Sequence, residues 1–399
     1  MIIGVVNIFI QFWINEEQRC DGVTKKIECQ TSELSKLIES YKAVIIGPKK
    51  CFDTHKNHYK FYQKVTLFKS KIFVENILFI KCFFFRKILT DNILNLSKDD
   101  IIYIRYPILI TSIPLRFFFK KKRFKLIFEH NTIELEEFKL RNGKFSLSYF
   151  HEFFFGCIIR SISDVIIGVT EEITQYEISF LVNQNKPHYT IGNGIIVKNQ
   201  ILRNHKRLKY DCYELICVAQ FNKWHGIDRL INGLNQYNKK IPVILHLVGN
   251  GIETFDIPEN STNERPLFSI IKHGFMTGIE LDHLFNQCHI AVGSLGLHRI
   301  GLNESSTLKA REYCARGIPY IIACGDPDFP DDFPYIFRVP PDESPIDIES
   351  VINFAQKVCS DPDHPQKMRK YAEENLDWAI KMKKLKEFLE TLVDEHQSV

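Results

Sequence analysis

Short apolar runs rich in β-branched residues recur along this chain between longer segments with helical spacing, and this alternation restricts its fold more than any other feature. Runs of about four to eight apolar residues are typical of strands buried on both faces of a parallel sheet. The alternation comes in two successive blocks, which predicts two doubly wound α/β domains. The predicted strands are 2–10, 43–47, 101–105, 125–128, 164–168 and 188–191 in the first block, and 215–219, 243–248, 290–292, 320–323 and 336–339 in the second.

The length also favours two domains, because 399 residues exceed the roughly 250–300 at which a single core stops growing. A basic stretch without periodicity separates the blocks, so we expect one domain at 1–200 and a second at 201–375. A charged helical segment with one apolar stripe follows at about 365–393. Its end, 376–399, is expected to form a C-terminal helix that can pack back on the first domain. The other predicted helices are 31–41, 171–181, 227–237, 279–287 and 307–316.

Charge is unevenly distributed. Residues 1–200 contain 29 Lys and Arg against 20 Asp and Glu, and the remaining residues contain 23 against 28. Two clusters of aromatic and basic residues, at 81–87 and 116–124, lie in the basic half. They fit peripheral contact with an anionic membrane, where each cation contributes about 1 kcal/mol. They fit equally well a Phe core edged by solvated Lys, and both interpretations stay open. We expect no nucleic-acid partner.

The cysteines and the start of the chain indicate a cytoplasmic protein. The 11 Cys have no CxxC pair and no regular spacing, as expected of reduced thiols. The apolar start at 1–10 lacks a basic region and soon meets acidic residues, so it fits a buried strand better than a signal peptide. No run approaches the roughly 18 apolar residues of a spanning helix, so any attachment to the cytoplasmic face of the membrane would be peripheral.

Segment 293–319 indicates chemistry, because it leaves a predicted strand, forms a loop and enters a helix. Ser305, Ser306 and Thr307 are suited to the helix N-cap. Such a helix start presents free backbone N–H groups at the carboxyl edge of a parallel sheet, where anions bind. Glu304 and Glu312 are eight positions apart, just over two helical turns. This spacing predicts two carboxylates on nearly one face, on either side of the anion.

At this segment the chain resembles the retaining GT-B glycosyltransferases of family 4, which carry Glu-x7-Glu. The run Glu304-Ser-Ser-Thr-Leu-Lys-Ala-Arg-Glu312 has that spacing, and Ala315-Arg-Gly-Ile-Pro319 resembles the Ala-x-Gly-x-Pro that often follows. The spacing alone also fits a solvated helix face with a salt bridge to Lys309. The resemblance covers about residues 100–325, through segments in the family's order at 103–107, 128–131, 163–170, 191–194, 216–231, 245–251, 272–275, 281–285 and 288–292.

The resemblance implies an α/β fold of the GT-B type, with two Rossmann-like domains that face a cleft and a C-terminal helical tail. It implies a nucleotide diphosphate sugar as donor substrate and no other cofactor. In the family the first Glu contacts donor-sugar hydroxyls and the second binds the ribose, so Glu304 is expected to be catalytic. The expected donor-binding residues are Gln220, Lys223, His225, Gly226, Arg299, Ser305, Ser306, Thr307, Leu308, Lys309 and Glu312.

The chain departs from the family at the donor diphosphate. Gln220 and His225 stand where the family usually has Arg and Lys, and an amide and an imidazole are weaker phosphate ligands. Lys223, Arg299 and Lys309 are the candidates to compensate. Arg299 is preferred, since it lies on the loop that leads into the phosphate-binding helix. The alternative is an arginine that fixes this loop through hydrogen bonds to carbonyl groups.

In the first domain the resemblance points to His130, which ends a predicted strand and would touch the donor sugar as a second catalytic residue. Gly22 replaces the family's Gly-Gly loop only in part. Together with Arg105 it is expected on the acceptor side. No cluster of residues predicts a metal site, and Asp326-Pro-Asp328 and Asp361-Pro-Asp363 resemble proline turns.

The reaction implied is transfer of a hexosyl unit, with retained configuration, to a glycan or lipid-linked acceptor in bacterial surface polysaccharide synthesis. Attack on the front face is expected, because no carboxylate can be assigned as a covalent nucleophile. Two alternatives stay open: a nucleotide-sugar epimerase of the same fold, and a non-catalytic subunit that binds a sugar or a partner. A nicotinamide dehydrogenase is disfavoured, because no Gly-x-Gly-x-x-Gly follows a first strand.

Overall fold

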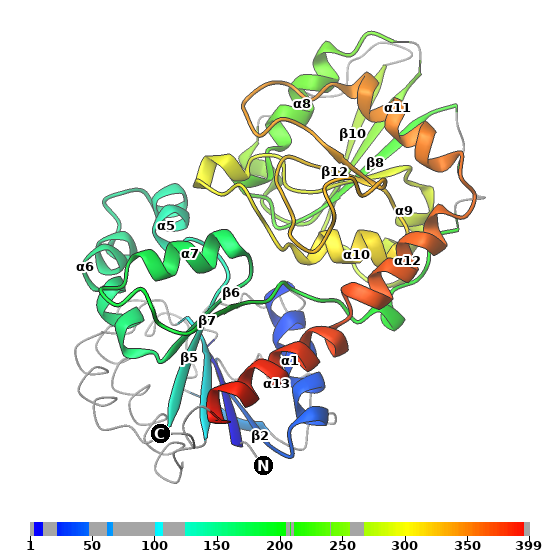
Figure 1. Cartoon of the computed structure of the whole chain (residues 1–399). Helices are drawn as coiled ribbons and strands as arrows, with labels where there is room; N and C mark the ends of the chain where they lie inside the picture. Colours follow the sequence, from blue (N-terminus) through cyan, green and yellow to red (C-terminus); the bar gives the residue numbers. More distant parts are fainter. Residues whose placement is uncertain are drawn as a thin grey trace. The chain divides into compact units, whose positions relative to one another are not determined.

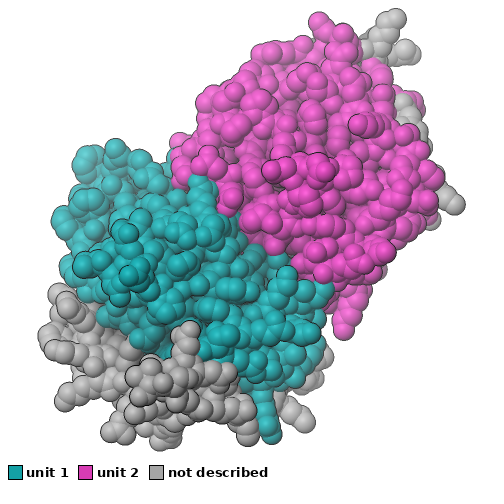
Figure 2. All heavy atoms as spheres, viewed as in Figure 1, with its two compact units in different colours: residues 1–192, 378–399 teal, residues 193–377 magenta. Residues whose placement is uncertain are grey.

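The computed structural model describes residues 4–10, 22–47, 62–66, 100–106, 124–204, 208, 211–239, 241–255 and 267–394. The chain forms two compact units, coloured separately in Figure 2. Unit 1 consists of Met1–Gly192 and Trp378–Val399, and unit 2 of Asn193–Asp377. Unit 1 is therefore built from two separate pieces of sequence, whereas unit 2 is continuous.

Unit 1 contains a parallel sheet of seven strands in the order β3-β2-β1-β4-β5-β6-β7. The reversal of strand order between β1 and β4 is typical of a doubly wound fold. The strands are β1 (Gly4–Ile10), β2 (Ser40–Gly47), β3 (Tyr62–Thr66), β4 (Ile101–Arg105), β5 (Lys125–His130), β6 (Val165–Gly168) and β7 (His188–Thr190). The described helices of this unit are α1 (Gly22–Leu37), α5 (Glu134–Asn142), α6 (Leu147–Ile162), α7 (Glu171–Ser179) and α13 (Trp378–Asp394).

The last helix, α13, packs beside the first helix, α1, although the two are far apart in sequence (Figure 1). The rings of Tyr189 and Phe388 stack with centroids 4.4 Å apart. The Nζ of Lys125 donates a hydrogen bond to the carbonyl of Leu392. The end of the chain is thus a structural part of unit 1.

Unit 2 repeats the topology with a parallel sheet of six strands in the order β10-β9-β8-β11-β12-β13. Here the strand order reverses between β8 and β11. The strands are β8 (Tyr213–Val218), β9 (Val243–Val248), β10 (Phe268–Gly274), β11 (Ile290–Val292), β12 (Tyr320–Ile322) and β13 (Ile336–Arg338). The described helices are α8 (Ile227–Gln236), α9 (Ile279–Gln287), α10 (Leu308–Arg316), α11 (Ile348–Cys359) and α12 (His364–Asn375).

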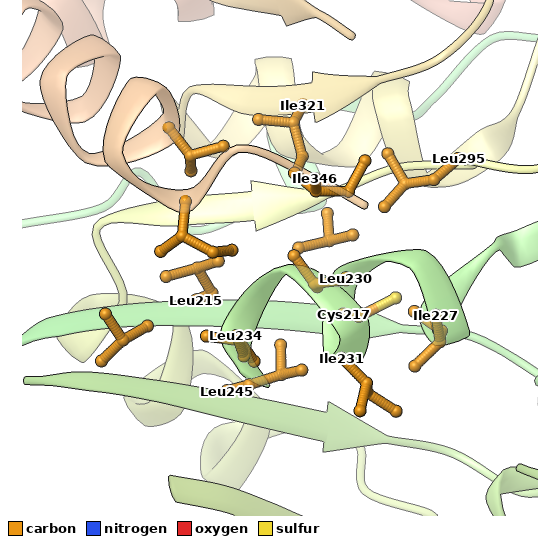
Figure 3. Close-up of a cluster of buried hydrophobic side chains, with 14 of the residues drawn as sticks. Leu215, Cys217, Ile227, Leu230, Ile231, Leu234, Leu245, Leu295, Ile321 and Ile346 are labelled. Atoms are coloured by element: carbon orange, nitrogen blue, oxygen red, sulfur yellow. The ribbon is translucent and has the colours of Figure 1, made fainter. Parts of the chain in front are cut away.

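The core of unit 2 shows why α8 forms where it does. Its apolar residues Ile227, Leu230, Ile231 and Leu234 recur at helical spacing and are all buried against the sheet. Figure 3 shows these side chains meeting apolar residues of β8, β9 and β12. Burying each such side chain contributes roughly 1.5–3 kcal/mol. This packing fixes the start of α8 relative to the end of β8.

The two sheets confirm the predicted pair of doubly wound α/β domains. Two strands, β3 and β10, were missed, and both lie at an edge of their sheet. An edge strand is covered less completely, so its sequence need not be a continuous apolar run. In strand β10 only Ile270 is buried, and the strand includes the polar residues Lys272 and His273. The pattern used to find central strands therefore does not detect it.

The predicted helical segment at the end of the chain is not one helix, and that expectation was wrong. It breaks between α12 and α13 at Leu376 and Asp377. The carbonyl of Leu376 accepts a hydrogen bond from Ile195 N at 2.9 Å. The carboxylate of Asp377 accepts one from Val197 N at 3.0 Å. These bonds tie the break to the segment that enters unit 2.

None of the helices in the described part of the chain is both long and apolar enough to cross a membrane. The aromatic and basic clusters at 81–87 and 116–123 lie outside the described residues, so their membrane or core role stays a prediction. Phe124, the last residue of the second cluster, is buried.

Candidate active site

In unit 2, the loops after β8 and β11 lie where the strand order reverses, which is the usual ligand position in a doubly wound sheet. The two loops bind each other through their backbones. Leu295 N donates to the carbonyl of His225 at 3.0 Å, and Gly296 N donates to that of Trp224 at 3.2 Å. The predicted donor-binding residues Gln220, Lys223, His225 and Gly226 lie on the first loop, and Arg299 lies on the second.

Gly226 is required by this loop contact. It has a left-handed backbone with φ of 64°, which favours glycine. It also precedes α8 directly. A Cβ built on Gly226 would lie 2.7 Å from the carbonyl carbon of Leu295. No larger residue fits without moving one of the two loops, so Gly226 sets the distance between them.

The helix that follows the second loop, α10, begins with free backbone donors. Thr307 occupies its N-cap in an extended conformation, and no side chain caps it. Ser305 and Ser306 were also expected at the N-cap, but they lie in the extended segment before it. The Ser306 hydroxyl accepts a hydrogen bond from Asn193 N at 2.7 Å, and Ser305 N donates to the carbonyl of Gly325 at 2.9 Å. The two serines fix the segment, while the N–H groups at the helix start stay available to an anion.

Lys309 lies in the first turn of α10, and its Nζ is buried without a hydrogen-bond partner among the described residues. Burial lowers the pKa of Lys309, with smaller opposing effects from Cys217 and Cys324. The structure therefore does not show the alternative interpretation, a salt bridge between Lys309 and a glutamate on a solvated helix face. An ammonium group left unpaired away from water is costly, which indicates a position built to receive an anion.

His225 adjoins this lysine. Burial, and then the charge of Lys309, hold the pKa of His225 well below its usual value, so its ring is neutral near pH 7. Its Nδ1 accepts a hydrogen bond from Asn222 N at 3.0 Å, which leaves the ring proton on Nε2. His225 therefore offers an N–H donor rather than a second charge. The structure brings together His225, Lys309 and the start of α10 in one group.

Glu304 and Glu312 do not share a helical face, and that expectation was wrong. Glu304 pairs with Gly325 in an isolated parallel bridge, four residues before α10 begins. Glu312 lies within α10, where its Oε1 accepts a hydrogen bond from Arg316 Nε at 2.9 Å. Arg316 also donates to Asp282 at 2.7 Å. Backbone pairing, rather than helix geometry, holds Glu304 in place.

Arg299 is held by two carboxylates. It donates to Asp228 at 2.9 and 2.6 Å and to Glu343 at 2.9 and 2.5 Å, and its Nη1 also donates to the carbonyl of Lys223 at 2.7 Å. Hydrogen bonds from Arg299 lower the pKa of Glu343 to about 2. These contacts fit the interpretation of an arginine that fixes the loop. A contact of Arg299 with phosphate stays a prediction. The side chains of Gln220 and Lys223 are exposed.

The two aspartates of the turn 326–328 bind Arg311, a residue that the sequence analysis did not single out. Arg311 is fully buried and pairs with the carboxylates of Asp326 and Asp328, with one bond of 2.8 Å to Asp326. Its Nε donates to the carbonyl of Asn193 at 3.0 Å. Arg311 thus fastens α10 to the turn and to the segment that holds Ser306.

In unit 1, two of the predicted residues, Arg105 and His130, lie at the carboxyl ends of strands. Arg105 ends β4 and pairs with Glu129 in the β4–β5 register. Glu129 is buried, contacts Lys26 of α1, and accepts a hydrogen bond from the Tyr103 hydroxyl at 2.6 Å. Gly22 is the first residue of α1. Neighbouring strand ends and the start of α1 thereby meet through buried polar contacts.

His130 ends β5 and is fully buried. Its ring stacks on Tyr106 with centroids 4.3 Å apart. Its Nδ1 lies 3.3 Å from Glu134 Oε1 and 3.1 Å from Glu177 Oε2. Both glutamates also pair with Arg160. Sequence reasoning missed these partners, although Glu134 stands four positions after His130 in the sequence.

Two groups among the described residues have ligand atoms within 4.8 Å of one another, as a metal site requires. The first is His130, Glu134 and Glu177, where the guanidinium of Arg160 already occupies the place of a cation between the carboxylates. The second is Glu214, His246 and Cys288. His246 binds Glu214 at 3.1 Å and His273 at 2.9 Å, so hydrogen bonds already satisfy both of its ring nitrogens.

A search against protein-family models found no match, and no curated protein matches the chain in sequence. Solved structures do match it over nearly its whole length. Sucrose-phosphate synthase from Thermosynechococcus elongatus is 13% identical, with a TM-score of 0.65 and coverage of 98% of this chain and 99% of that one.

The Anabaena protein HepE, solved in complex with UDP, is 11% identical with a TM-score of 0.62, covering 97% of this chain and all of its own. The lipopolysaccharide outer core galactosyltransferase WaaB is 13% identical with a TM-score of 0.55, covering 95% and 98%. The chain has the GT-B fold. At these identities the likeness establishes the fold alone, and the GT-B architecture accounts for the two parallel sheets with helices at the C-terminus.

Proposed function

We propose that the chain is a retaining glycosyltransferase, similar to family 4, that moves a hexosyl unit from a nucleotide diphosphate sugar to a glycan or lipid-linked acceptor. We place this reaction in bacterial surface polysaccharide synthesis. The observation that carries the proposal is the uncapped start of α10 with the buried Nζ of Lys309 in its first turn, which has no hydrogen-bond partner among the residues described. This arrangement of N–H and ammonium donors suits a diphosphate. That structures of the similarly folded HepE hold UDP and UDP-glucose supports the same ligand class.

Each proposed donor ligand has a chemical role that follows from its position. The N–H groups at Thr307, Leu308 and Lys309, together with the Lys309 ammonium and the Nε2–H of His225, would stabilise the diphosphate as it departs. Such preorganised donors typically lower a barrier by several kcal/mol. Glu304 would accept hydrogen bonds from sugar hydroxyls, and Glu312 from the ribose. Arg299 would act on the diphosphate-binding loop through Lys223 and Asp228.

The proposed reaction needs no protein nucleophile. The acceptor hydroxyl would attack the anomeric carbon on the face that the diphosphate leaves, and a leaving phosphate oxygen would take the hydroxyl proton. His130 would contact the sugar. Donor binding relies on the helix start and on Lys309, so we propose that no metal ion is required.

The surface of α6 supports an acceptor with an apolar part. The side chains of Phe145, Phe150, Phe153 and Phe154 are exposed on this helix and in the loop before it. Phenylalanine rings exposed together are unusual on a soluble surface and indicate a contact with an apolar partner. A lipid-linked glycan offers such a part, so we place the acceptor side on unit 1, with Gly22 and Arg105.

Ligand-induced thermal stabilisation tests the proposal. We expect a uridine, guanosine or adenosine diphosphate sugar to raise the melting temperature of the intact chain, because a ligand at 100 times its Kd stabilises by about 2.7 kcal/mol. The Lys309→Met variant should lose the shift, and Lys370→Met, which changes an exposed lysine of α12, should keep it. If no nucleotide sugar in the panel stabilises the protein, the proposal fails.

A labelled-donor assay then separates the reaction classes. Transfer to an acceptor with retained anomeric configuration, followed by NMR, is the expected result. An inverted product would contradict the retaining mechanism. Release of an epimerised nucleotide sugar without acceptor would replace the proposal with the epimerase.

A further inference from the structure

The side chains around His130 form a buried charge cluster that the reaction above does not explain. We call His130, Glu134, Glu152, Arg160 and Glu177 the His130 cluster; all five are at most 5% exposed. They come from β5, α5, α6 and α7 (Figure 1). Four separate elements thus place ionisable groups around one imidazole.

The cluster has more carboxylates than cations. Arg160 pairs with Glu134 at 3.1 Å and also contacts Glu152 and Glu177. Glu129, beside His130 on β5, forms a separate ion pair with Lys26. Three carboxylates against one guanidinium would leave buried negative charge unpaired, which is costly. The cluster therefore retains a proton on one of its groups.

The retained proton is bound by the carboxyl groups rather than by the imidazole. Burial raises the pKa of Glu134 to about 8 and that of Glu177 to about 7. Burial lowers the pKa of His130 to about 4. At neutral pH the pair Glu134 and Glu177 therefore retains the proton, and the ring of His130 is neutral.

The contacts of individual atoms decide which ring nitrogen carries the imidazole proton. Glu177 Oε2 accepts a hydrogen bond from Arg160 Nε, so this oxygen does not itself carry a proton. The same oxygen lies 3.1 Å from His130 Nδ1. An acceptor oxygen facing Nδ1 requires that Nδ1 donate. Glu134 Oε1 lies 3.3 Å from the same nitrogen, and a hydrogen bond between Glu134 and Glu177 keeps the retained proton on the carboxyl pair.

The other ring nitrogen is then left with a lone pair. His130 Nε2 is buried and has no hydrogen-bond partner among the described residues. The stacked ring of Tyr106, at an interplanar angle of 29°, fixes the plane of the imidazole. The Tyr106 hydroxyl in turn accepts from Arg160 Nη1 at 2.9 Å. The cluster thus sets both the orientation of the ring and the position of its proton.

We propose that Glu177, assisted by Glu134, is a positioning residue that holds His130 as a neutral imidazole with its proton on Nδ1, so that Nε2 accepts a hydrogen bond from a substrate hydroxyl. The second half of this proposal rests on the proposed glycosyltransferase function; the first half does not. An imidazolium, or the opposite tautomer, would present a donor at Nε2 and could not accept from a hydroxyl.

The tautomer can be measured in the free protein without any substrate. We expect two-bond ¹⁵N correlations of histidine-labelled protein at pH 7.5 to show His130 neutral with a protonated Nδ1, the signal being assigned from its loss in His130→Gln. A charged ring or a protonated Nε2 would overturn the proposal, whatever the enzyme's activity. If the Nδ1–H form is found but no nucleotide sugar is used, the positioning holds and the glycosyltransferase function fails.

Two substitutions of Glu177 test its role as a positioning residue. Glu177→Gln keeps an acceptor oxygen for Arg160 and His130, and should retain the tautomer and most of kcat. Glu177→Met removes that oxygen and should populate the Nε2–H form and lower kcat about 10- to 100-fold. The donor KM should change less than kcat. Equal losses in both variants, with an unchanged tautomer, would mean a merely structural residue. Circular dichroism and melting temperature check that each variant is folded.

Discussion

The six strands of unit 2 follow the same order as six of the seven in unit 1, yet the polar groups at the strand ends are organised differently. In unit 1, Arg160 and Lys26 pair with buried carboxylates, and the His130 cluster contains an excess of acid. In unit 2, the corresponding edge has the uncapped start of α10 and Lys309, whose Nζ has no hydrogen-bond partner in the described part of the chain. The comparison shows that the same topology brings polar groups to this edge in both units, while the side chains decide whether their charges are paired within the protein.

The largest effect is expected from filling the contact between the two loops of unit 2. Gly226→Ala should lower the free energy of unfolding by roughly 2–4 kcal/mol, because it combines a left-handed backbone with a clash against Leu295. Gly301→Ala is a matched control, since Gly301 has a φ of 69° but no atom within 4 Å of a built Cβ. It should cost only roughly 1–2 kcal/mol. Equal losses in urea unfolding would show that the loop contact is not tight.

The second largest effect is expected from replacing Lys309 of unit 2. Lys309→Met should weaken binding of the nucleotide sugar about 10- to 100-fold, as expected for a lost charged hydrogen bond. The same variant should raise the melting temperature of the free protein, because it removes a buried ammonium that no described residue pairs with. Calorimetric titration and thermal melting measure the two changes. A less stable variant would mean that Lys309 is satisfied in the free protein.

The excess acid of unit 1 predicts a dependence of stability on pH. Glu134 has a pKa of about 8 when folded, above the ordinary value of 4.5, so the folded state binds the additional proton between these values. The free energy of unfolding should therefore fall between pH 6.5 and 8, by about 1–2 kcal/mol. Glu134→Gln should flatten this part of the curve. His130, with a lowered pKa, acts only below pH 6.5 and in the opposite direction.

The smallest effect is expected at Arg299. Since its donors are directed at Asp228, Glu343 and the carbonyl of Lys223, Arg299→Ala should raise the donor KM less than about tenfold through loosening of the loop. Steady-state kinetics measure it. A loss as large as that of Lys309→Met would show that Arg299 reaches the diphosphate directly, and unchanged kinetics would remove it from the site.

The sequence was informative where one local pattern had one structural meaning. Strands 101–105, 243–248 and 290–292 and helix 279–287 were predicted with their observed bounds, because central strands and amphipathic helices have distinct periodicities. The loop before α10 was found from its position between a strand and a helix. The prediction that Glu304 and Glu312 share a helical face was wrong. The bridge that holds Glu304 pairs it with Gly325, 21 residues further along the chain.

The same limit applies to the partners of His130. The contact of Glu134 with His130 could have been predicted from the sequence, because the two residues are four positions apart. Arg160 and Glu177 lie 30 and 47 positions away, and only the packing of α6 and α7 beside β5 brings them to the imidazole. Lys309 likewise interacts electrostatically with Cys217 and Cys324, which belong to other segments. Long-range contacts of this kind leave no periodic signal.

The placement of α13 in unit 1 has a consequence for synthesis on the ribosome. Unit 2 is complete once Asp377 has emerged, but unit 1 still lacks the helix that packs on α1 and receives the hydrogen bond of Lys125. Domains often finish folding in their order along the chain. Here the order is reversed, because the first unit to be translated is the last that can be completed. A ribosome that stops before Trp378 would release a chain with a finished second unit and an unfinished first one.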